Sequence, residues 1–346
     1  VLYIMTIIEF GNKLDFNNVL IRPKRSTLES RSEVSLERDF KFKHSTKTWK
    51  GVPVISANMD STGTLGVFEC LRNHNILTAL NKFYDVSDLK NLDESFKTMC
   101  MISTGISDSD YTKLVNILSN VDCDWICIDI ANGYMNKLVD FCKKVRKNFP
   151  DKIIVAGNVV SKEMVEELLI NGKVDIVKVG IGPGSACTTR MKTGVGMPQL
   201  SSVMECADAA HGVGGHIISD GGITCPGDMA KAFGGGADFV MMGGQFAGHD
   251  QNPGDVIIDG EKTYKTFYGM SSHKAQEMHY GKINNYRSSE GRVLKIPYKG
   301  DLNDTVNDYL GGLRSTCTYI GASTIKQVPK CTTFVCVSQQ LNTVFV

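Results

Sequence analysis

Short apolar runs and amphipathic stretches alternate along most of the chain. Eight apolar runs have the length and side-chain character of strands, at residues 52–57, 76–79, 99–103, 124–130, 153–156, 175–180, 216–220 and 239–242. Five stretches between them repeat apolar residues at helical spacing, at residues 111–120, 136–148, 162–171, 200–210 and 228–233. This alternation indicates parallel strands joined by crossover helices. Eight such units predict an α/β fold, a closed (β/α)8 TIM barrel rather than an open doubly wound sheet.

Two parts of the chain do not fit this repeat. Residues 1–50 are charged and irregular and are expected to form an N-terminal arm. Its apolar start, VLYIMTIIEF, lacks a basic beginning and a cleavage site, so we interpret it as an edge strand or docking arm rather than a signal peptide. Residues 245–300 are long, polar and interrupted by glycine, as lids and binding loops are, and are expected to form a flap.

The end of the chain completes the predicted architecture. A last helix is expected at residues 304–313 and a terminal strand near residues 333–337. Helix starts have suitable caps, with Ser161 before one helix and Pro226 with Asp228 opening another. Since no linker divides the chain, residues 1–346 are predicted to form a single barrel domain.

Composition excludes several classes of protein. Hydrophobic residues make up 42% and charged residues 22% of the 346 residues, which excludes disorder or coiled coil as the main architecture. A net charge of +1 gives no strong field for nucleic acid or an anionic membrane. No apolar stretch is long enough to span a membrane. Eleven scattered cysteines without a Cys-x-x-Cys pair predict free thiols, no zinc site and a reducing, cytosolic compartment.

The chemically distinctive residues follow the predicted strands. In a barrel of this kind the active site lies where the strands end. The densest group is VGIGPGSACTTR, residues 179–190. Gly182, Gly184 and neighbouring carbonyls can coordinate a bare cation. Cys187 lies in this loop away from any apolar run, which favours a nucleophile over the buried inert thiol expected for the other cysteines. Thr188 and Thr189 place hydroxyls beside it, and for Thr188 simple turn hydrogen bonding is the preferred interpretation.

Two glycine-containing loops indicate a nucleotide. Asp220 precedes Gly221 and Gly222, and a carboxylate there can accept both hydroxyls of a ribose, although it can also simply terminate a strand. Gly243 and Gly244 follow the eighth strand, where barrels of this kind bind phosphate.

Charged residues elsewhere leave alternatives open. In RSSEGR, residues 287–292, Arg287 can hold a base or a phosphate, and Glu290 can donate a proton if its site is partly desolvated. The alternative is a solvated charge cluster on a loop. Lys82 can pair with a cofactor phosphate or with a carboxylate at the barrel rim.

Five motifs in this order resemble those of the guanosine 5′-monophosphate (GMP) reductases. The motifs are GIGPGSACTTR, SDGG, GGGADFVMMGG, FYGMSS and YRSSEG, and the resemblance extends over nearly the whole chain. The sister family, inosine monophosphate (IMP) dehydrogenase, shares the barrel and the cysteine loop. It usually carries a regulatory domain pair inserted in the barrel and an Arg-Tyr pair in its flap. Here the second and third strands leave no room for the insert, and no Arg-Tyr pair lies between Gly244 and Tyr268. Both features favour the reductase.

The resemblance implies a reaction in which NADPH reduces GMP to IMP with release of ammonia. It implies that Cys187 attacks the purine C2 as a thiolate and forms a covalent thioimidate, which hydride then resolves. Thr189 and Glu290 match the residues that the family uses to protonate the leaving amino group.

The resemblance also assigns binding residues. It places GMP against Asp220, Gly221, Gly222, Gly243, Gly244, Gly269, Met270, Ser271, Arg287, Ser288, Ser289 and Gly291. It places the cofactor against Lys82, Asp129, Ile130, Ala131, Ile181, Gly182, Tyr286, Arg287, Ser315, Thr316, Cys317 and Thr318. Ser30 and Arg31 match residues that reach a neighbouring subunit's cofactor, which implies a homotetramer. It places potassium among Gly182, Gly184, Cys187 and Arg190.

Some features depart from the family's pattern. Asn81-Lys82-Phe83-Tyr84 stands where the family often has His-Lys-His-Tyr, one extra residue lies near residues 171–174, and the apolar N-terminal extension has no counterpart. Two alternatives follow. One is an IMP dehydrogenase without its regulatory insert. The other is a non-enzymatic purine-nucleotide sensor, which would have no need of Cys187, Thr189 and Glu290.

Overall fold

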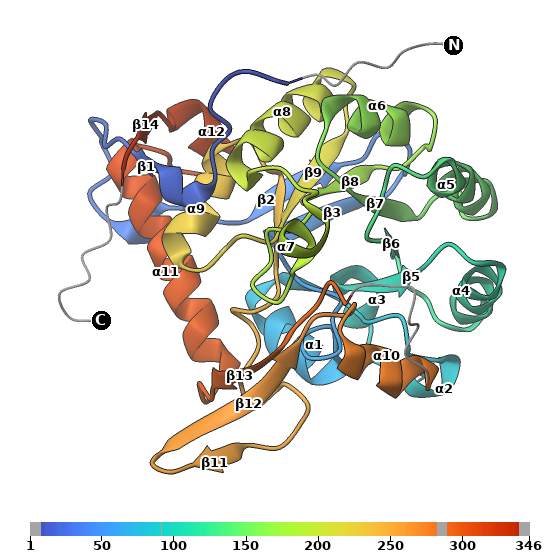
Figure 1. Cartoon of the computed structure of the whole chain (residues 1–346). Coiled ribbons are helices and arrows are strands. Elements are labelled where there is room, and N and C mark those ends of the chain that lie inside the picture. Colours follow the sequence, from blue (N-terminus) through green and yellow to red (C-terminus); the bar gives the residue numbers. More distant parts are fainter. Residues whose placement is uncertain (1–7, 91, 282–288, 339–346) are drawn as a thin grey trace.

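A closed parallel barrel forms the centre of the computed structural model, which describes residues 8–90, 92–281 and 289–338. Its eight strands are β3 (Thr48–Ser56), β4 (Ile76–Ala79), β5 (Cys100–Thr104), β6 (Trp125–Asp129), β7 (Ile153–Val159), β8 (Ile176–Val179), β9 (His216–Asp220) and β10 (Phe239–Met242). Each pairs in parallel with the next, and β10 pairs with β3 through Val240 and Val54. This pairing closes the barrel and confirms the fold class predicted from the alternating pattern (Figure 1).

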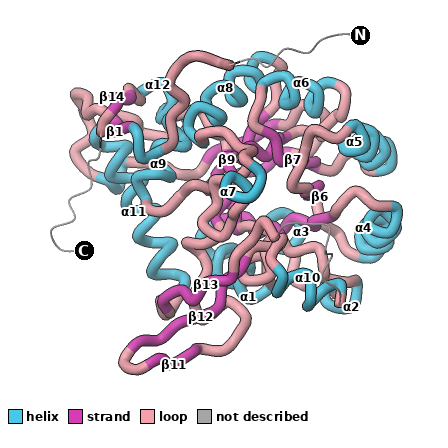
Figure 2. Tube along the Cα trace, viewed as in Figure 1, coloured by secondary structure: helices cyan, strands magenta, loops and turns pink. Residues whose placement is uncertain are grey.

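Most of the helices cover the outside of the barrel, while α7 (Thr189–Thr193) follows the Cys187 loop and α10 (His273–Tyr280) belongs to the predicted flap. The other helices are α1 (Leu65–Leu71), α2 (Val86–Leu89), α3 (Ser95–Met99), α4 (Asp108–Asn120), α5 (Asn136–Asn148), α6 (Lys162–Ile170), α8 (Gln199–Gly212), α9 (Pro226–Gly234), α11 (Leu302–Ile320) and α12 (Val328–Cys331). All five expected helices are present. The last helix continues to Ile320, beyond the expected end at residue 313, because its buried face persists through Cys317. Figure 2 shows α7 and long loops in front of the barrel strands.

Local sequence explains where several helices begin. The hydroxyl of Ser107 accepts a hydrogen bond from the backbone N–H of Asp110, and Asp301 accepts one from Asn303, so both cap free donors of a first helical turn. Pro226 is the first residue of α9, where its missing N–H costs nothing. Ser161 stands at the expected N-cap of α6, but its side chain makes no capping bond.

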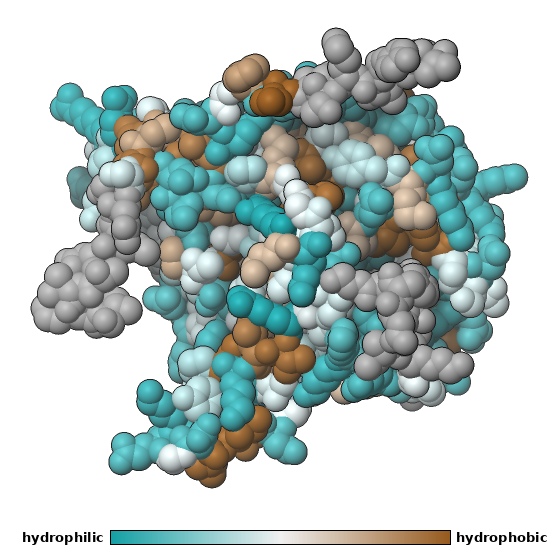
Figure 3. All heavy atoms as spheres, in the orientation of Figure 1, coloured by the Kyte–Doolittle hydropathy of each residue, from teal (hydrophilic) through white to brown (hydrophobic). Residues whose placement is uncertain are grey.

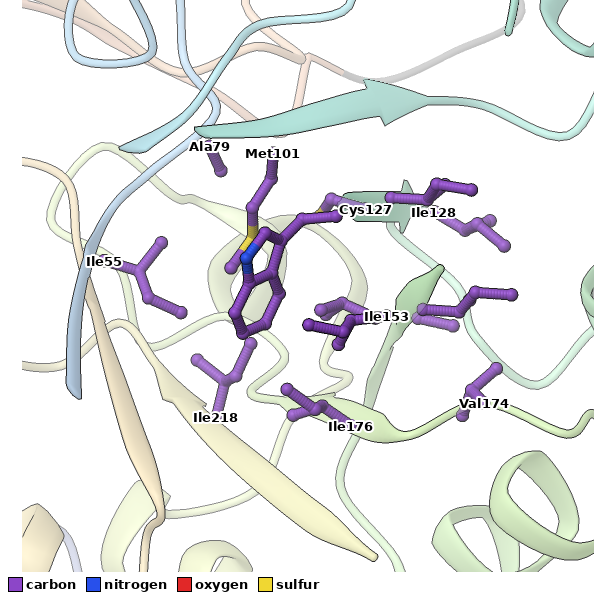
Figure 4. Close-up of a cluster of buried hydrophobic side chains, with 14 of the residues drawn as sticks. Ile55, Ala79, Met101, Cys127, Ile128, Ile153, Val174, Ile176 and Ile218 are labelled. Carbon is purple, nitrogen blue, oxygen red and sulfur yellow. The ribbon is translucent and has the colours of Figure 1, made fainter. Parts of the chain in front are cut away.

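The barrel interior is filled with apolar side chains and closed at one end by aromatic rings. Figure 4 shows Ile55, Met101 and Ile218 converging from different strands. At the amino-terminal end, the rings of Phe40 and Phe239 stack with centroids 4.2 Å apart. Phe40 belongs to β2 (Arg38–Lys41), which pairs antiparallel with β3 and extends the sheet under the barrel. Because this end is plugged, a ligand can enter only where the strands end.

The N-terminal arm and the segment after β10 contain more regular structure than expected. The arm carries η1 (Phe16–Asn18), β1 (Val19–Ile21) and η2 (Arg31–Glu33). β1 pairs antiparallel with β14 (Phe334–Cys336), which is the terminal strand that the sequence predicts. Two further 3-10 helices are η3 (Arg72–His74) and η4 (Ile325–Gln327). Of the apolar extension, residues 8–10 adopt no regular structure, and residues 1–7 lie outside the described residues.

The predicted flap contains a small antiparallel sheet followed by a helix. β11 (Ile257–Asp259), β12 (Lys262–Tyr268) and β13 (Val293–Pro297) form this sheet, and α10 lies between β12 and β13 in sequence. Ile258, at the far end of the sheet, is 76% exposed. Figure 3 shows hydrophobic side chains gathered at the lower end of the molecule, where Figure 1 places β11 and β12.

Candidate active site

A cavity of about 400 Å³ opens at the carboxyl ends of the barrel strands. Every barrel strand contributes to its wall, through Ala57, Asn58, Lys82, Thr104, Asp129, Asn158, Gly180, Asp220 and Gly243. The Cys187 loop and the flap residues Gly269, Met270, Ser271, Glu290 and Gly291 complete the lining. One cavity therefore gathers most of the residues that the sequence places at the site.

Cys187, Thr189 and Glu290 form a continuous hydrogen-bonded chain in this cavity. The Sγ of Cys187 lies 3.1 Å from the Oγ1 of Thr189, and Thr189 donates to the Oε2 of Glu290 at 2.7 Å. A threonine hydroxyl has a single hydrogen. Because that hydrogen goes to Glu290, the thiol must donate to the Thr189 oxygen. The chain can therefore carry a proton from the sulfur to the carboxylate, producing a thiolate and a protonated Glu290 together.

Backbone pairing holds the cysteine loop against the segment that carries Glu290. The N–H of Thr188 donates to the carbonyl of Glu290 at 2.8 Å, and the N–H of Arg292 donates to the carbonyl of Ala186 at 3.0 Å. The Thr188 hydroxyl also donates to the carbonyl of Ser289 at 3.3 Å, a bond between remote segments rather than the local turn bond expected for it. These bonds bring together two segments that are remote in sequence and fix the distance between Thr189 and Glu290.

The N-terminal arm supports the other side of the same loop. Arg190 donates to the Oδ2 of Asp15 at 3.1 Å and to the carbonyl of Met197 at 2.6 Å. Its aliphatic stem packs against Gly182, whose φ of +82° and close neighbour leave no room for a Cβ. A glycine is therefore required at this position. The sequence had not assigned Asp15 to the site.

The loop carries oxygen atoms of the class that hard cations prefer. Among the described residues, the carbonyls of Gly182 and Cys187 accept no hydrogen bond from the protein, while that of Gly184 accepts one from the N–H of Cys187. Arg190, whose guanidinium is itself a cation, can contribute only its carbonyl. Within the described part of the chain no cluster of His, Cys, Asp and Glu side chains is arranged to hold a metal.

A charged network centred on Lys178 forms part of the cavity wall. The ammonium of Lys178 lies 2.9 Å from the Oδ2 of Asp220 and 3.0 Å from the Oδ1 of Asp129. Asn158 also donates to the Oδ2 of Asp220 at 2.8 Å, and Asn58 donates to the Oδ2 of Asp129 at 2.9 Å. Burial disfavours the ammonium, but the two carboxylates outweigh it and raise the pKa of Lys178. Burial likewise opposes ionisation of Asp129, yet Lys178 lowers its pKa.

Sequence reasoning missed Lys178, although a signal was present. Lys178 is the only charged residue within the strand run IVKV, and its side chain is only 3% exposed. A lysine in a buried strand needs a partner. The identity of that partner depends on the barrel, in which β9 lies next to β8 and β6 lies two strands away on the other side.

The glycine loops allow backbone to approach the cavity closely. Gly221 and Gly222 have φ values of +87° and +80°, which favour glycine. A Cβ on Gly244 would lie 2.7 Å from the Oγ of Ser185, so a side chain there would press into the cysteine loop. Both loops line the cavity together with Ile181 and Gly182.

The flap is joined to the barrel near Lys82. The Oδ2 of Asp60 lies 2.7 Å from the Nε2 of His279 on α10 and accepts a hydrogen bond from the Tyr268 hydroxyl at 3.0 Å. The ring of His279 stacks on Phe83, with centroids 3.4 Å apart. Lys82, Phe83 and His279 line the cavity with Asp129, Ile130 and Ala131. Asp60 and His279 were not expected at the site.

Several expected binding residues do not line this cavity. Ser30 and Arg31 lie at η2 in the arm, and Ser315, Thr316, Cys317 and Thr318 lie on α11, with Cys317 fully buried. The arm runs beside the end of this helix, where the N–H of Lys24 donates to the carbonyl of Tyr319 at 2.9 Å. Tyr286, Arg287 and Ser288 lie outside the described residues.

The cysteines are unpaired, as their scattered positions predict. All eleven cysteines fall within the described ranges, and all are free thiols. In the described part of the chain, no helix combines the length and apolarity needed to cross a membrane.

Comparison with known proteins gives one consistent result. A family model described as the IMP dehydrogenase / GMP reductase domain matches residues 13–342. A protein of Aliivibrio fischeri named GMP reductase is 55% identical over 343 residues, covering 98% of this chain and 99% of its own length. Proteins of the same name from Vibrio cholerae and Yersinia enterocolitica are 54% and 56% identical over the same coverage.

Proposed function

This chain belongs to the IMP dehydrogenase/GMP reductase family, and we propose that it is a GMP reductase that converts GMP to IMP with NADPH and releases ammonia. The observation that carries the proposal is the chain of hydrogen bonds from Cys187 through Thr189 to Glu290. This chain lies in a cavity that is also lined by the glycine loops after β9 and β10. A nucleophile beside a proton acceptor is what covalent catalysis needs. The names of the similar proteins support the choice of reaction.

In the proposed mechanism, Cys187 first becomes a thiolate. Its proton passes through the Thr189 hydroxyl to Glu290. The sulfur then attacks the purine C2, and a carbon–sulfur bond forms. Glu290 returns the proton through Thr189 to the leaving amino group, the carbon–nitrogen bond breaks, and ammonia departs from a thioimidate. One relay therefore serves both proton transfers.

The cofactor is proposed to bind beside Lys82, Asp129, Ile130 and Ala131, which line the same cavity as Cys187. Ile181 and Gly182 line this cavity as well. NADPH bound there would supply a hydride to C2, and the Cys187 sulfur would leave as a thiolate. Lys82 would place a positive charge near its phosphates, and the stacked Phe83 and His279 would cover the site.

GMP is proposed to bind across the opposite wall. Asp220, Gly221 and Gly222 would hold the ribose, and Gly243 and Gly244 the phosphate. Gly269, Met270, Ser271, Ser289 and Gly291 would border the base, together with Arg287 and Ser288. Carboxylates suit ribose hydroxyls, and free backbone N–H groups suit phosphate.

A monovalent cation, K⁺, is proposed among the carbonyls of Gly182, Gly184, Cys187 and Arg190. The carbonyls of Gly182 and Cys187 accept no hydrogen bond within the described part of the chain, which supports this placement because K⁺ takes uncharged oxygen ligands. The cation would hold the loop in the shape that presents the Cys187 sulfur.

A cytosolic homotetramer of single-domain barrels completes the proposal. Ser30, Arg31 and Ser315–Thr318 lie away from the chain's own cavity, as residues that serve a neighbouring subunit's cofactor would. Light scattering measures the mass of the assembly in solution and tests this proposal. The mass of a monomer or a dimer would contradict it.

The reaction is tested by following NADPH absorbance on addition of GMP, with ammonia assayed in the same tube. Equal loss of NADPH and gain of ammonia is expected. NADH formation from IMP and NAD, without turnover of GMP, would instead identify an IMP dehydrogenase. Tight GMP binding with neither reaction would identify a nucleotide sensor.

A further inference from the structure

We propose that Lys178 is a positioning residue that fixes the orientation of the Asp220 carboxylate and ties it to Asp129 across the barrel. This inference rests on the proposed function, because it takes the ribose of GMP as the ligand of Asp220. It adds to that function a residue that touches neither substrate nor cofactor in the mechanism above.

Lys178 lies on β8, between β9, which carries Asp220, and the more distant β6, which carries Asp129. Lys178 is 2% exposed. Its Nζ lies 2.9 Å from the Oδ2 of Asp220 on β9 and 3.0 Å from the Oδ1 of Asp129 on β6. A third neighbour is the Sδ of Met241 on β10, at 3.5 Å. One buried ammonium therefore joins side chains that come from three other strands.

The two oxygens of Asp220 have different surroundings. Its Oδ2 accepts from both Lys178 and Asn158. Its Oδ1 accepts no hydrogen bond from the described residues, and Asp220 lines the cavity. Rotation of the carboxylate would break both hydrogen bonds to Oδ2. The two donors to Oδ2 therefore also fix the position of Oδ1. Oδ1 is the oxygen available to a ribose hydroxyl.

Asp129, unlike Asp220, has a partner on each of its two carboxylate oxygens. Lys178 takes Oδ1, and Asn58 donates to Oδ2. If Lys178 lost its charge, Asp129 and Asp220 would face the barrel interior without the cation that now lies between them. The side chains of Asp129 and Asp220 are 34% and 20% exposed, so water can reach both carboxylates without Lys178. Each would nevertheless lose the buried donor that now fixes its orientation.

A buried lysine in this protein does not need carboxylate partners. Lys265 on β12 is similarly buried, at 5% exposed, yet its ammonium donates to the carbonyls of His249 and Asn252. It does not line the cavity. Lys265 is therefore a matched control for the effect of removing a buried ammonium.

The test compares binding of GMP and 2′-deoxy-GMP by calorimetry in the wild-type protein and in Lys178→Met. We expect wild-type protein to prefer GMP and the variant to lose about tenfold to a hundredfold of that preference, the worth of a hydrogen bond to a charged group. The KM for NADPH should rise in the same variant, through Asp129. Lys265→Met should bind GMP and 2′-deoxy-GMP in the wild-type ratio.

Further variants keep the test decisive. If Lys178→Met does not fold, Lys178→Met with Asp129→Asn removes one of the two facing carboxylates and should fold while still losing the preference. Asp220→Asn should lose the preference alone, and adding Lys178→Met should then change it little. An unchanged ratio in the Lys178 variants, or equal binding of both nucleotides by wild-type protein, overturns the inference. Failure of wild-type protein to reduce GMP would instead contradict the proposed function.

Discussion

The Oγ1 of Thr189 lies 2.7 Å from the Oε2 of Glu290, although the two residues are 101 positions apart. This contact connects the cysteine loop after β8 to the flap segment before β13. It gives the Cys187 thiol a route for its proton that neither segment provides by itself.

Cys187→Ala should abolish turnover of GMP while GMP binding survives. Without the sulfur no covalent intermediate can form, and loss of a nucleophile typically costs about 10³-fold or more. NADPH oxidation and calorimetric binding of GMP measure the two quantities separately. Cys336→Ala, at an exposed cysteine in β14, is the control and should keep full activity. Substantial residual turnover in Cys187→Ala would remove this residue from the nucleophile role.

Glu290→Gln should slow ammonia release by about 10²-fold or more, as loss of a general acid–base group does. The amide can still accept the Thr189 hydrogen bond, so the loop geometry is kept while the proton acceptor is lost. Ammonia is measured in single turnovers. Thr189→Val should cause a loss of similar size, and the double variant should be little worse than either single one. A wild-type rate in Glu290→Gln would place the acid elsewhere.

Asp60→Asn should raise the KM for NADPH by about tenfold while kcat changes little, since hydrogen bonds to a charged group are worth about 1.5–3 kcal/mol. Asp60 holds both His279 and Tyr268, so its charge fixes α10 and the stacked Phe83 beside the proposed cofactor position. Steady-state kinetics with varied NADPH provides the measurement. His273→Gln changes an exposed residue on the same helix and should leave the KM unaltered. A fall in kcat at constant KM would argue against the proposed role.

Stability should fall as the pH drops from about 6.5 towards 4, in part because of His249. Burial lowers the pKa of His249 to about 4, and its Nε2 lies 2.7 Å from the Oγ1 of Thr305. Between those pH values the unfolded chain binds a proton there that the folded chain does not. The contribution of neutral His249 to the stability of the folded protein is therefore complete above pH 6.5. About 2 kcal/mol of this contribution is lost between pH 7 and pH 5.

Urea denaturation at several pH values and one protein concentration measures this effect. His249→Gln should be less stable at pH 7 but should lose less stability on acidification. His273→Gln, with its exposed side chain, should retain the wild-type pH dependence. An identical pH dependence in wild-type protein and His249→Gln would contradict the assignment.

Much of the fold was available from the sequence because it depends on local regularities. Eight apolar runs separated by helical stretches predicted the barrel, and each run lies at or next to an observed strand. Since the ends of parallel strands meet at one rim, the positions of Cys187, Asp220 and Gly243 in the sequence were enough to place them at one cavity.

Structure in the arm and flap was less predictable because it depends on remote pairing. β1 forms against β14, and β13 forms against β12 across the intervening α10. Neither short strand has enough apolar alternation to be recognised alone. For the same reason the sequence described residues 245–300 only as a long polar flap.

The residue types of the site and their order can be read along the chain: a cysteine in a glycine loop, an aspartate before two glycines and a glutamate in the flap. Which of these residues touch depends on how the chain folds. The contacts of Glu290 with Thr189 and of Lys178 with Asp129 and Asp220 join distant segments, and their geometry is set by barrel closure and by backbone pairing between loops. Side-chain chemistry is encoded residue by residue, whereas proximity between remote residues is a property of the folded chain.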